Sequence, residues 1–355
     1  MYVGLIISSG DDNNEVNSNR MNNNINDINL LPQGESINAI HEFNELHSKD
    51  SFFKTITNIA DRFNYKSSGW KRKRKDIRFI IWSYIHYSRL KHLMNTFLTP
   101  NLSVILALHP HILKKPFKPY LCVNWNKKQR ITSVTQHFQC MSELFSSNLP
   151  LIYRDEGYCL LEIEDRDEAK YKLILDRGQN REGALGLRLV NDKNQRIYMI
   201  TMNLSQENQG SMYIGSIQGP NHDVENRNDI IKALTKGCHG LRPKALILEF
   251  AIMLARSLDI KMLCGISNKS HMYQSWRYIG RKRNVVTFDY DSHWQEYGAE
   301  VFNNDFYKIP LNVPKKDLES LNRNKRKLYT KRYQWLQETE LLFDANISKI
   351  ITKNR

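Results

Sequence analysis

Two glycines and two cations come just before a helix that the sequence predicts from Pro243 to about Leu258. Proline suits the first helical position, so Gly237 and Gly240 precede a helix N-terminus, where backbone N–H groups and the helix dipole attract anions. Lys236 and Arg242 add positive charge at the same turn. These residues predict a binding site for a phosphate-bearing ligand. The alternative is that both glycines only allow a tight turn into a buried helix.

A second group of reactive side chains follows a strand predicted from Ile260 to Ser267. The C-terminal ends of strands gather ligand-facing polar groups in open sheets. His271 and Tyr273 are the catalytic candidates, because proton transfer needs an acid or base within hydrogen-bond reach of the substrate. The alternative is a capped helix start, with Ser267 and Asn268 as caps and His271 in solvent.

The sequence contains no motif for a zinc site, a common nucleotide-binding loop or a hydrolase active site. The 5 cysteines contain no C-x-x-C pair, which argues against a zinc site and a disulfide framework, and no metal site is predicted. The turn before Pro243 matches neither the Walker pattern nor G-x-G-x-x-G, and no nucleophile elbow is present. The carboxylates around His293, which are Asp289, Asp291, Glu296 and Glu300, could line a cleft or contact a cation, but solvated surface carboxylates are more common.

The chain carries a net charge of +15, which attracts nucleic acid, an anionic membrane face or phosphate-bearing ligands. Positive charge gathers in the run Lys71 to Lys75 and in the segment Lys315 to Leu342, which is predicted as a basic amphipathic helix. Both segments also carry apolar residues, so an anionic membrane surface is a candidate partner, and a solvated face is the alternative. Nucleic acid is disfavoured because no helix-turn-helix, zinc-finger or RNP signature is present.

The location predicted for the protein is cytoplasmic, with attachment to the inner membrane surface as an option. The first ten residues lack a basic region and a long apolar region, so they do not resemble a signal peptide. No apolar run approaches the roughly 20 residues of a spanning helix. The oligomeric state stays open.

The expected fold class is mixed α/β, of the α+β kind, with a largely antiparallel central sheet flanked by helices. Five strand-like segments separated by turn residues predict an antiparallel meander between Tyr158 and Gln218. Further strands are expected at 285–288 and 306–309, and a helix from Asp76 to about Phe97 is expected to be closed by Pro100. Four parts are predicted: a disordered Asn-rich leader (1–35), a helical part (36–150), a mixed core (151–312) and a basic C-terminal helix (313–355).

This order of elements resembles the acyl-CoA-dependent N-acetyltransferase superfamily. In that superfamily, backbone amides at a comparable turn hold the pyrophosphate of the cofactor. The resemblance implies an N-acetyltransferase-like core and acyl-CoA as a candidate cofactor. The superfamily's usual turn, which is Gln or Arg, two residues, Gly, one residue and then Gly or Ala, is not reproduced here. Similarity of fold alone does not establish an activity.

Longer strings carry a second resemblance, to the VirK/YbjX family. They include His109-Pro110-His111, Arg181-Glu182-Gly183, Ile217-Gln218-Gly219-Pro220, His239 to Lys244, Gly265 to Asn268, His271, Tyr290-Asp291 and Phe306 to Pro310. The resemblance implies an association with virulence, with surface or outer-membrane properties and with resistance to cationic antimicrobial peptides. The family is a domain of unknown function, so it transfers no catalytic residue.

Two functional hypotheses follow. The first is an acyltransferase-like enzyme that uses a phosphate-bearing acyl donor at Gly237 to Pro243 and acts on an envelope precursor. The second is a non-enzymatic adaptor that binds anionic lipid or a partner protein through its basic surfaces.

Overall fold

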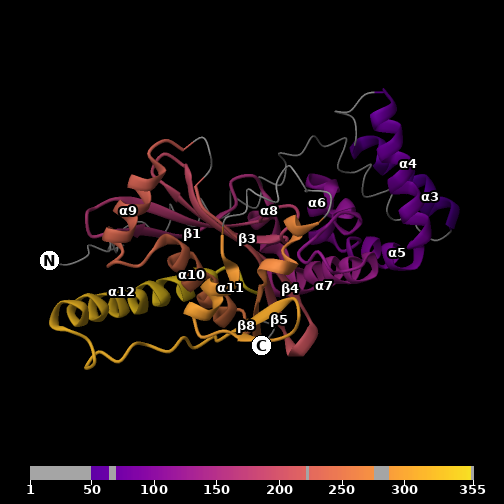
Figure 1. The fold of residues 1–355 in the computed structure, drawn as a ribbon. Coiled ribbons are helices and arrows are strands. Elements are labelled where there is room, and N and C mark those ends of the chain that lie inside the picture. The colour runs from indigo at the N-terminus through magenta and orange to yellow at the C-terminus, as the bar shows by residue number, and fades with distance from the viewer. Residues whose placement is uncertain (1–48, 64–68, 221–223, 276–287, 353–355) are drawn as a thin grey trace, which may run out of the picture.

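The computed structural model describes residues 49–63, 69–220, 224–275 and 288–352. These residues build one twisted sheet with helices packed around it (Figure 1). The predicted leader, 1–35, lies outside the described residues, as does most of the strand expected at 285–288. Within the described chain, no helix is both long enough and apolar enough to cross a membrane.

The sheet has eight strands in the order β1-β2-β3-β4-β5-β6-β8-β7, and β5 and β6 form its parallel pair. The mixed α/β class with a largely antiparallel sheet is therefore confirmed. The strands are β1 (Tyr158–Glu164), β2 (Lys170–Asp176), β3 (Leu185–Asn191), β4 (Arg196–Ser205), β5 (Ser211–Gln218), β6 (Met262–Ile266), β7 (Glu300–Val301) and β8 (Phe306–Ile309).

Helices cover both faces of the central strands. Successive side chains of a strand point to opposite faces, and all of β5 except its last residue is buried, so both of its faces must be covered. Helices α7 (Lys127–Phe145) and α10 (Pro243–Ser257) both pack on β4. The predicted apolar helix is confirmed as α10, because it begins at Pro243 and buries residues all round its circumference.

The N-terminal part is helical, but its boundaries differ from those predicted. The single helix expected from Asp76 to about Phe97 is two helices, α4 (Gly69–Ile85) and α5 (Tyr87–Thr96), with a break at His86, where φ is −111°. Pro100 does not only end a helix: it begins α6 (Pro100–Leu108), because proline is compatible with the first helical turn. A 3₁₀ helix spans Pro110–Phe117. Helices α3 (Lys49–Phe63) and α8 (Leu149–Tyr153) complete this part.

Three more helices follow the meander: α9 (Arg227–Gly237), α11 (Tyr290–Glu296) and α12 (Arg323–Ile347). The predicted basic C-terminal helix is present as α12, and it begins later than Lys315 because Asn322 caps it by accepting a hydrogen bond from the Lys325 N–H. Helix α12 packs against α10 and β1, at the opposite end of the molecule from α3 and α4 (Figure 1).

Candidate functional site

The parallel strands β5 and β6 separate before β5 ends. Their pairing runs as far as Ile214 and Gly265, after which β5 continues to Gln218. The hydroxyl of Tyr290 takes the place of a strand partner here, since it lies 3.2 Å from the Ile217 N and 3.4 Å from the Ile217 O. The start of α11 therefore fills the gap between the separated strands.

A buried carboxylate lies beside this gap. Glu182 is 1% exposed, and its Oε2 accepts hydrogen bonds from Ser216 Oγ at 2.7 Å and Gln218 Nε2 at 2.6 Å. Burial raises the pKa of Tyr273, and the negative charge of Glu182 raises it further. We call this group the Glu182 cluster; its members are Glu182, Ser216, Gln218, His271, Tyr273 and Tyr290.

His271 is buried, so the alternative that placed it in solvent is wrong. It is 2% exposed, and its ring stacks on Tyr290 with centroids 5.1 Å apart, because Asn268, just after β6, accepts a hydrogen bond from the Tyr290 N at 2.8 Å and so joins this segment to the start of α11. Burial lowers the pKa of His271 to about 4, so the ring is neutral at pH 7. Its Nε2 has no hydrogen-bond partner among the described residues. A neutral imidazole and a protonated Tyr273 phenol next to a carboxylate have the protonation states needed for proton transfer.

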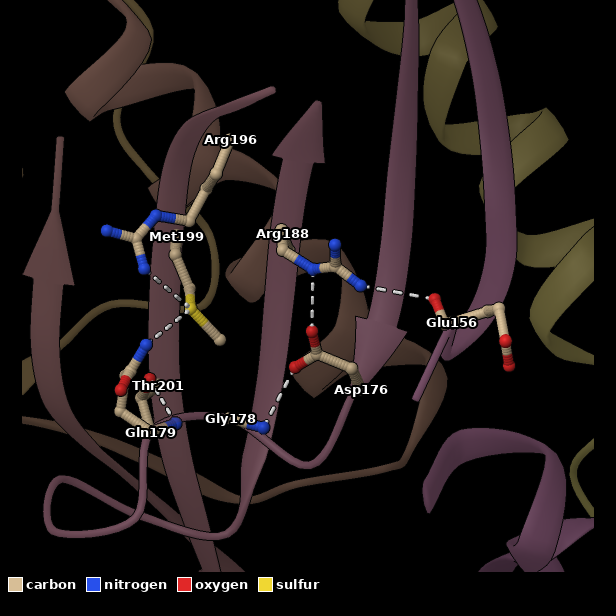
Figure 2. Close-up of polar contacts among 8 residues, drawn as sticks. All are labelled: Glu156, Asp176, Gly178, Gln179, Arg188, Arg196, Met199 and Thr201. Carbon is tan, nitrogen blue, oxygen red and sulfur yellow. Dashed lines mark hydrogen bonds and ion pairs between the residues drawn. The ribbon is translucent and has the colours of Figure 1, made fainter. Parts of the chain in front are cut away.

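The loop that presents Glu182, residues 177–184, is fixed at its base (Figure 2). Asp176 accepts hydrogen bonds from the Gly178 N at 2.8 Å and from Arg188 Nε at 2.8 Å. The backbone N–H after Gly178 donates to Thr201 Oγ1 at 3.2 Å. These bonds join the loop to β2, β3 and β4, so the position of Glu182 is set by the sheet.

Gly240 and Arg242 lie elsewhere, in a groove of about 1010 Å³ between α10, α12 and the segment 312–316. We call it the α10–α12 groove. Arg242 is exposed, and no side chain caps the start of α10. The groove's cations are Arg242, Lys244, Arg256, Lys315, Lys316 and Arg332, and its carboxylates are Glu249, Glu296 and Glu340.

Part of the positive charge in the α10–α12 groove is already paired. Lys244 Nζ lies 3.4 Å from Glu296, and Arg256 bonds to Glu340. Arg332 donates from Nε and Nη2 to the His239 carbonyl oxygen at 3.1 and 2.9 Å. Among the described residues, the structure gives a carboxylate contact for Lys244 and Arg256 but for none of the other four groove cations, Arg242, Lys315, Lys316 and Arg332, of which Arg332 bonds to the His239 carbonyl oxygen.

The remaining two predicted ligand residues do not line the groove. Lys236 Nζ pairs with Asp167 at 3.3 Å on the exposed side of α9. Gly237 packs against Asp165 so closely that an added Cβ would lie 2.0 Å from Asp165 Oδ2. The structure therefore brings Gly240 and Arg242 together and places Lys236 and Gly237 apart from them.

Helix α11 separates the Glu182 cluster from the α10–α12 groove. Tyr290, its first residue, contacts His271, and Glu296, its last, lines the groove. At 1.5 Å per residue the two ends are roughly 9 Å apart. Of the carboxylates near His293, Asp289 and Asp291 have structural roles, since both accept hydrogen bonds from Asn268. No group of three or more His, Cys, Asp or Glu residues in the described chain could hold a metal ion.

Sequence reasoning missed Glu182 as a central residue. The string Arg181-Glu182-Gly183 was visible, but nothing in it shows that the loop folds against Ser216 and Gln218. The strings that resemble the VirK/YbjX family supplied the signal, because Glu182, Gln218, His271 and Tyr290 all belong to them and meet in one cluster.

Comparison with known families matches residues 68–344 to a family described as "Protein of unknown function (DUF535)". The chain belongs to this DUF535 family. A relative in Escherichia coli K12, described as "Uncharacterized protein YbjX", is 28% identical over 241 residues, which are 67% of this chain and 72% of the relative. The resemblance to the VirK/YbjX family is thus confirmed.

Other relatives carry equally little functional description. An "Uncharacterized protein" of Haemophilus influenzae is 27% identical over 217 residues, 61% of this chain and 71% of its own length. A Mannheimia haemolytica protein described as "Membrane protein LapB" is 28% identical over 201 residues, 55% of this chain and 84% of its own. No solved structure gives a significant match.

Proposed function

We propose that this protein binds a phosphate-bearing acyl donor in the α10–α12 groove and acts as an acyltransferase on an envelope-related substrate. The observation that carries the proposal is the groove itself, where Arg242, Lys315 and Lys316 face a large cavity beside the uncapped start of α10. A helix N-terminus with added cations favours phosphate groups. The envelope role follows from the resemblance to the VirK/YbjX family.

The arrangement of elements supports the resemblance to acyl-CoA-dependent enzymes. An antiparallel meander leads into β5, and α10 then connects to β6, which is parallel to β5. Two features differ from the N-acetyltransferase superfamily. The superfamily's glycine turn is not reproduced, and α9 lies between β5 and α10. The acyl donor is therefore proposed by class, with acyl-CoA as the first probe.

The Glu182 cluster would supply the proton transfers. In acyl transfer to an amine, nitrogen attacks the thioester carbonyl carbon, the C–N bond forms, and the C–S bond breaks. The proton that the amine loses would pass to Nδ1 of neutral His271, which in the structure accepts a long hydrogen bond of 3.4 Å from the Tyr273 N–H, and the Tyr273 hydroxyl would donate a proton to the leaving thiolate. The acyl end of the donor must then reach past α11, roughly 9 Å from the groove. A donor with a long arm between phosphate and acyl group meets this requirement.

Thermal unfolding with a panel of CoA and acyl-CoA compounds tests the proposal. A ligand at about 100 times its Kd adds roughly 2.7 kcal/mol of stability. We expect one or more acyl-CoAs to raise Tm, and Arg242→Ala to abolish the shift. Lys236→Ala is the matched control, since it removes a cation of the same predicted turn that does not line the groove. If no compound shifts Tm, the proposal is wrong.

A second candidate function, binding to an anionic membrane surface, is supported by α4. Its outer side carries Trp70, which is 75% exposed, and also Ile77, Ile81, Tyr84 and Ile85. Lys73 and Arg74 are exposed on the same helix. Apolar and cationic side chains together suit a lipid interface.

Vesicle flotation tests the membrane candidate. We expect binding to phosphatidylglycerol vesicles that falls with salt, little binding to phosphatidylcholine vesicles, and loss of binding in a Trp70→Ala, Ile77→Ser double variant. A matched Val301→Ser variant, which changes an exposed apolar residue of β7, should bind normally. Equal binding by all three proteins would exclude α4 as the contact surface.

A further inference from the structure

A smaller pocket opens on the side of the 177–184 loop where the 3₁₀ helix packs. Its volume is about 250 Å³, and we call it the Lys115 pocket. It is lined by His111, Lys114, Lys115, Lys118, Asn180 and Arg181. None of these lining residues is a carboxylate. The pocket therefore gathers positive charge from two segments that are far apart in the sequence.

Lys115 is the buried member of this group. It is 8% exposed, and its Nζ donates to the carbonyl oxygens of Gly183 at 2.8 Å and Asn180 at 3.2 Å. It also lines a cavity of about 90 Å³ next to the pocket, together with Arg177. Carbonyl oxygens stabilise an ammonium group but do not neutralise it, and the negative charge of Glu182 offsets only part of the cost of burying this cation, since its pKa stays lowered.

Regular elements hold the cations in place. Lys114 and Lys115 are in the last turn of the 3₁₀ helix Pro110–Phe117. Just after it, the carbonyl oxygen of Lys118 accepts a hydrogen bond from Arg130 Nη1 of α7 at 2.9 Å. Arg181 is on the loop that Asp176 and Thr201 fix (Figure 2). Positions set in this way reduce the ordering cost of binding an anion.

We propose that the Lys115 pocket is a binding site for a compact dianion of the phosphate or sulfate type. Such an anion would offset the mutual repulsion of Lys114, Lys115, Lys118 and Arg181 and could accept several hydrogen bonds at once. The site is separate from the α10–α12 groove, with which it shares no lining residue. Phosphate can come as the free ion or as the phosphate group of a larger molecule, and the pocket recognises the chemistry that both share.

Binding to this pocket should depend on pH through Lys115. The pKa of Lys115 is lowered to about 7, mainly by burial and also by the positive charge of Arg177, and the negative charge of Glu182 offsets part of this lowering. His137 of α7 is close enough for Lys115 to lower its pKa in turn, and the ring of Tyr120 lies 5.5 Å from Nζ. A bound dianion favours the charged ammonium, so above pH 7 binding takes up a proton and weakens as pH rises.

Calorimetric titration with sulfate at constant ionic strength tests the site, because the charge of sulfate is constant between pH 6 and 8.5. We expect saturable binding at pH 6.5 that weakens by up to about tenfold per pH unit well above pH 7, the limit for one linked proton. A His111→Gln variant should keep this dependence, since an ordinary histidine titrates near 6.5. Saturable sulfate binding that does not change with pH would overturn the role given to Lys115.

Substitutions of single cations test whether sulfate binds in the Lys115 pocket or to cations elsewhere on the protein. Lys118→Gln and Arg181→Gln should each weaken sulfate at least about tenfold, the loss of one charge-assisted contact. Lys128→Gln, an exposed cation of α7 outside the pocket, is the matched control and should bind normally, as should Arg242→Ala in the groove. Absence of sulfate binding, or an equal loss in Lys128→Gln, would refute the proposal.

Inorganic phosphate and glycerol 3-phosphate, titrated in parallel, distinguish the two sources. Tighter binding of inorganic phosphate assigns the pocket to the free ion, and tighter binding of glycerol 3-phosphate assigns it to the phosphate group of a larger molecule. If sulfate binds and neither phosphate compound does, the phosphate assignment is wrong. Because Arg242→Ala should lose acyl-CoA and keep sulfate, failure of this site and failure of the proposed function give different results.

Discussion

The α10–α12 groove and the Lys115 pocket both gather cations, but they differ in how the protein balances that charge. In the groove, three carboxylates line the wall together with the cations, and Lys244, Arg256 and Arg332 are bonded within the protein. In the pocket, no carboxylate lines the wall, and the negative charges that act on its cations come from residues outside the lining, Asp76 on Lys114 and Glu182 on Lys115 and Arg181. A run of cationic residues in the sequence therefore does not predict how positive a surface is. The carboxylates that balance those cations come from other elements of the fold.

The two regions also differ in rigidity and size. The groove measures about 1010 Å³ and is bordered by the long segment before α12, whereas the pocket of about 250 Å³ is walled by a 3₁₀ helix and a loop tied to the sheet. A large groove suits an extended ligand, and a small fixed pocket suits a compact anion. Changes near the pocket should accordingly cost more stability than changes in the groove.

The largest difference between the two regions is expected in the loss of folding stability when a glycine near each is replaced by alanine. A Cβ at Gly215, beside the Glu182 cluster, would lie 1.8 Å from the backbone oxygen of Glu182, so the loop would have to move. Gly215→Ala should cost roughly 3 kcal/mol or more. At Gly240, φ is +73° and the nearest atom is the flexible end of Arg332, so Gly240→Ala should cost about 1–2 kcal/mol. Urea denaturation of both variants checks the order, and equal losses would contradict it.

The next largest loss of folding stability is expected from a substitution at the base of the 177–184 loop. Asp176→Ala removes the acceptor of the Gly178 N–H and of Arg188, at a cost of roughly 2–3 kcal/mol for breaking a mostly buried, charge-assisted pair. It should also weaken sulfate binding in the Lys115 pocket, because Arg181 loses its support. Acyl-CoA binding in the groove should be unchanged. A variant that is destabilised but binds sulfate like the wild type would separate the loop from the pocket.

Buried histidines should make the protein sensitive to acid. Burial lowers the pKa of His137 to about 3 and of His271 and His293 to about 4. Between these values and the ordinary 6.5, the unfolded chain binds more protons than the folded one, so stability falls as pH drops below 6.5. Each histidine contributes up to about 1.4 kcal/mol per pH unit. Replacing His271 with Leu should flatten the fall between pH 6.5 and 5, measured by urea midpoints, and an unchanged slope would contradict its burial.

The smallest change in folding stability is expected when a cation of the groove that is already in an ion pair is replaced. Lys244 pairs with the mostly exposed Glu296 at 3.4 Å, and such pairs contribute about 0.5 kcal/mol or less. Lys244→Gln should therefore leave the urea midpoint nearly unchanged and should not alter sulfate binding. A loss above about 1 kcal/mol would mean that the groove is more rigid than its exposure indicates.

Local patterns allowed much of the fold to be predicted. The meander predicted between Tyr158 and Gln218 is present as β1 to β5 with the same first and last residues, because Asp, Asn and Gly turns separate short apolar runs. The break at His86 was missed, since apolar residues at helical spacing lie after it, at Leu90 and Leu93, as well as before it in the stripe Ile77, Ile81 and Tyr84. That stripe predicted a helix correctly, yet most of it faces outward, because α4 packs through Phe79 and Ser83.

The candidate site was only partly predictable for a different reason. Gly240 and Arg242 reach the groove because they are next to the start of α10, which is a local property. Glu182 and Lys115 depend on contacts across long stretches of chain: Glu182 meets Ser216, and Lys115 meets Gly183. Propensity and spacing do not encode such pairs, and their partners become known only when the sheet is assembled.

Calorimetric titration of the best acyl-CoA into the wild type, Arg242→Ala and Lys118→Gln tests the central claim most directly. If the α10–α12 groove holds the phosphate-bearing donor, Lys118→Gln binds it like the wild type and Arg242→Ala binds it at least about tenfold more weakly. The reverse pattern, with acyl-CoA lost in Lys118→Gln and kept in Arg242→Ala, would place the donor in the Lys115 pocket and contradict the account.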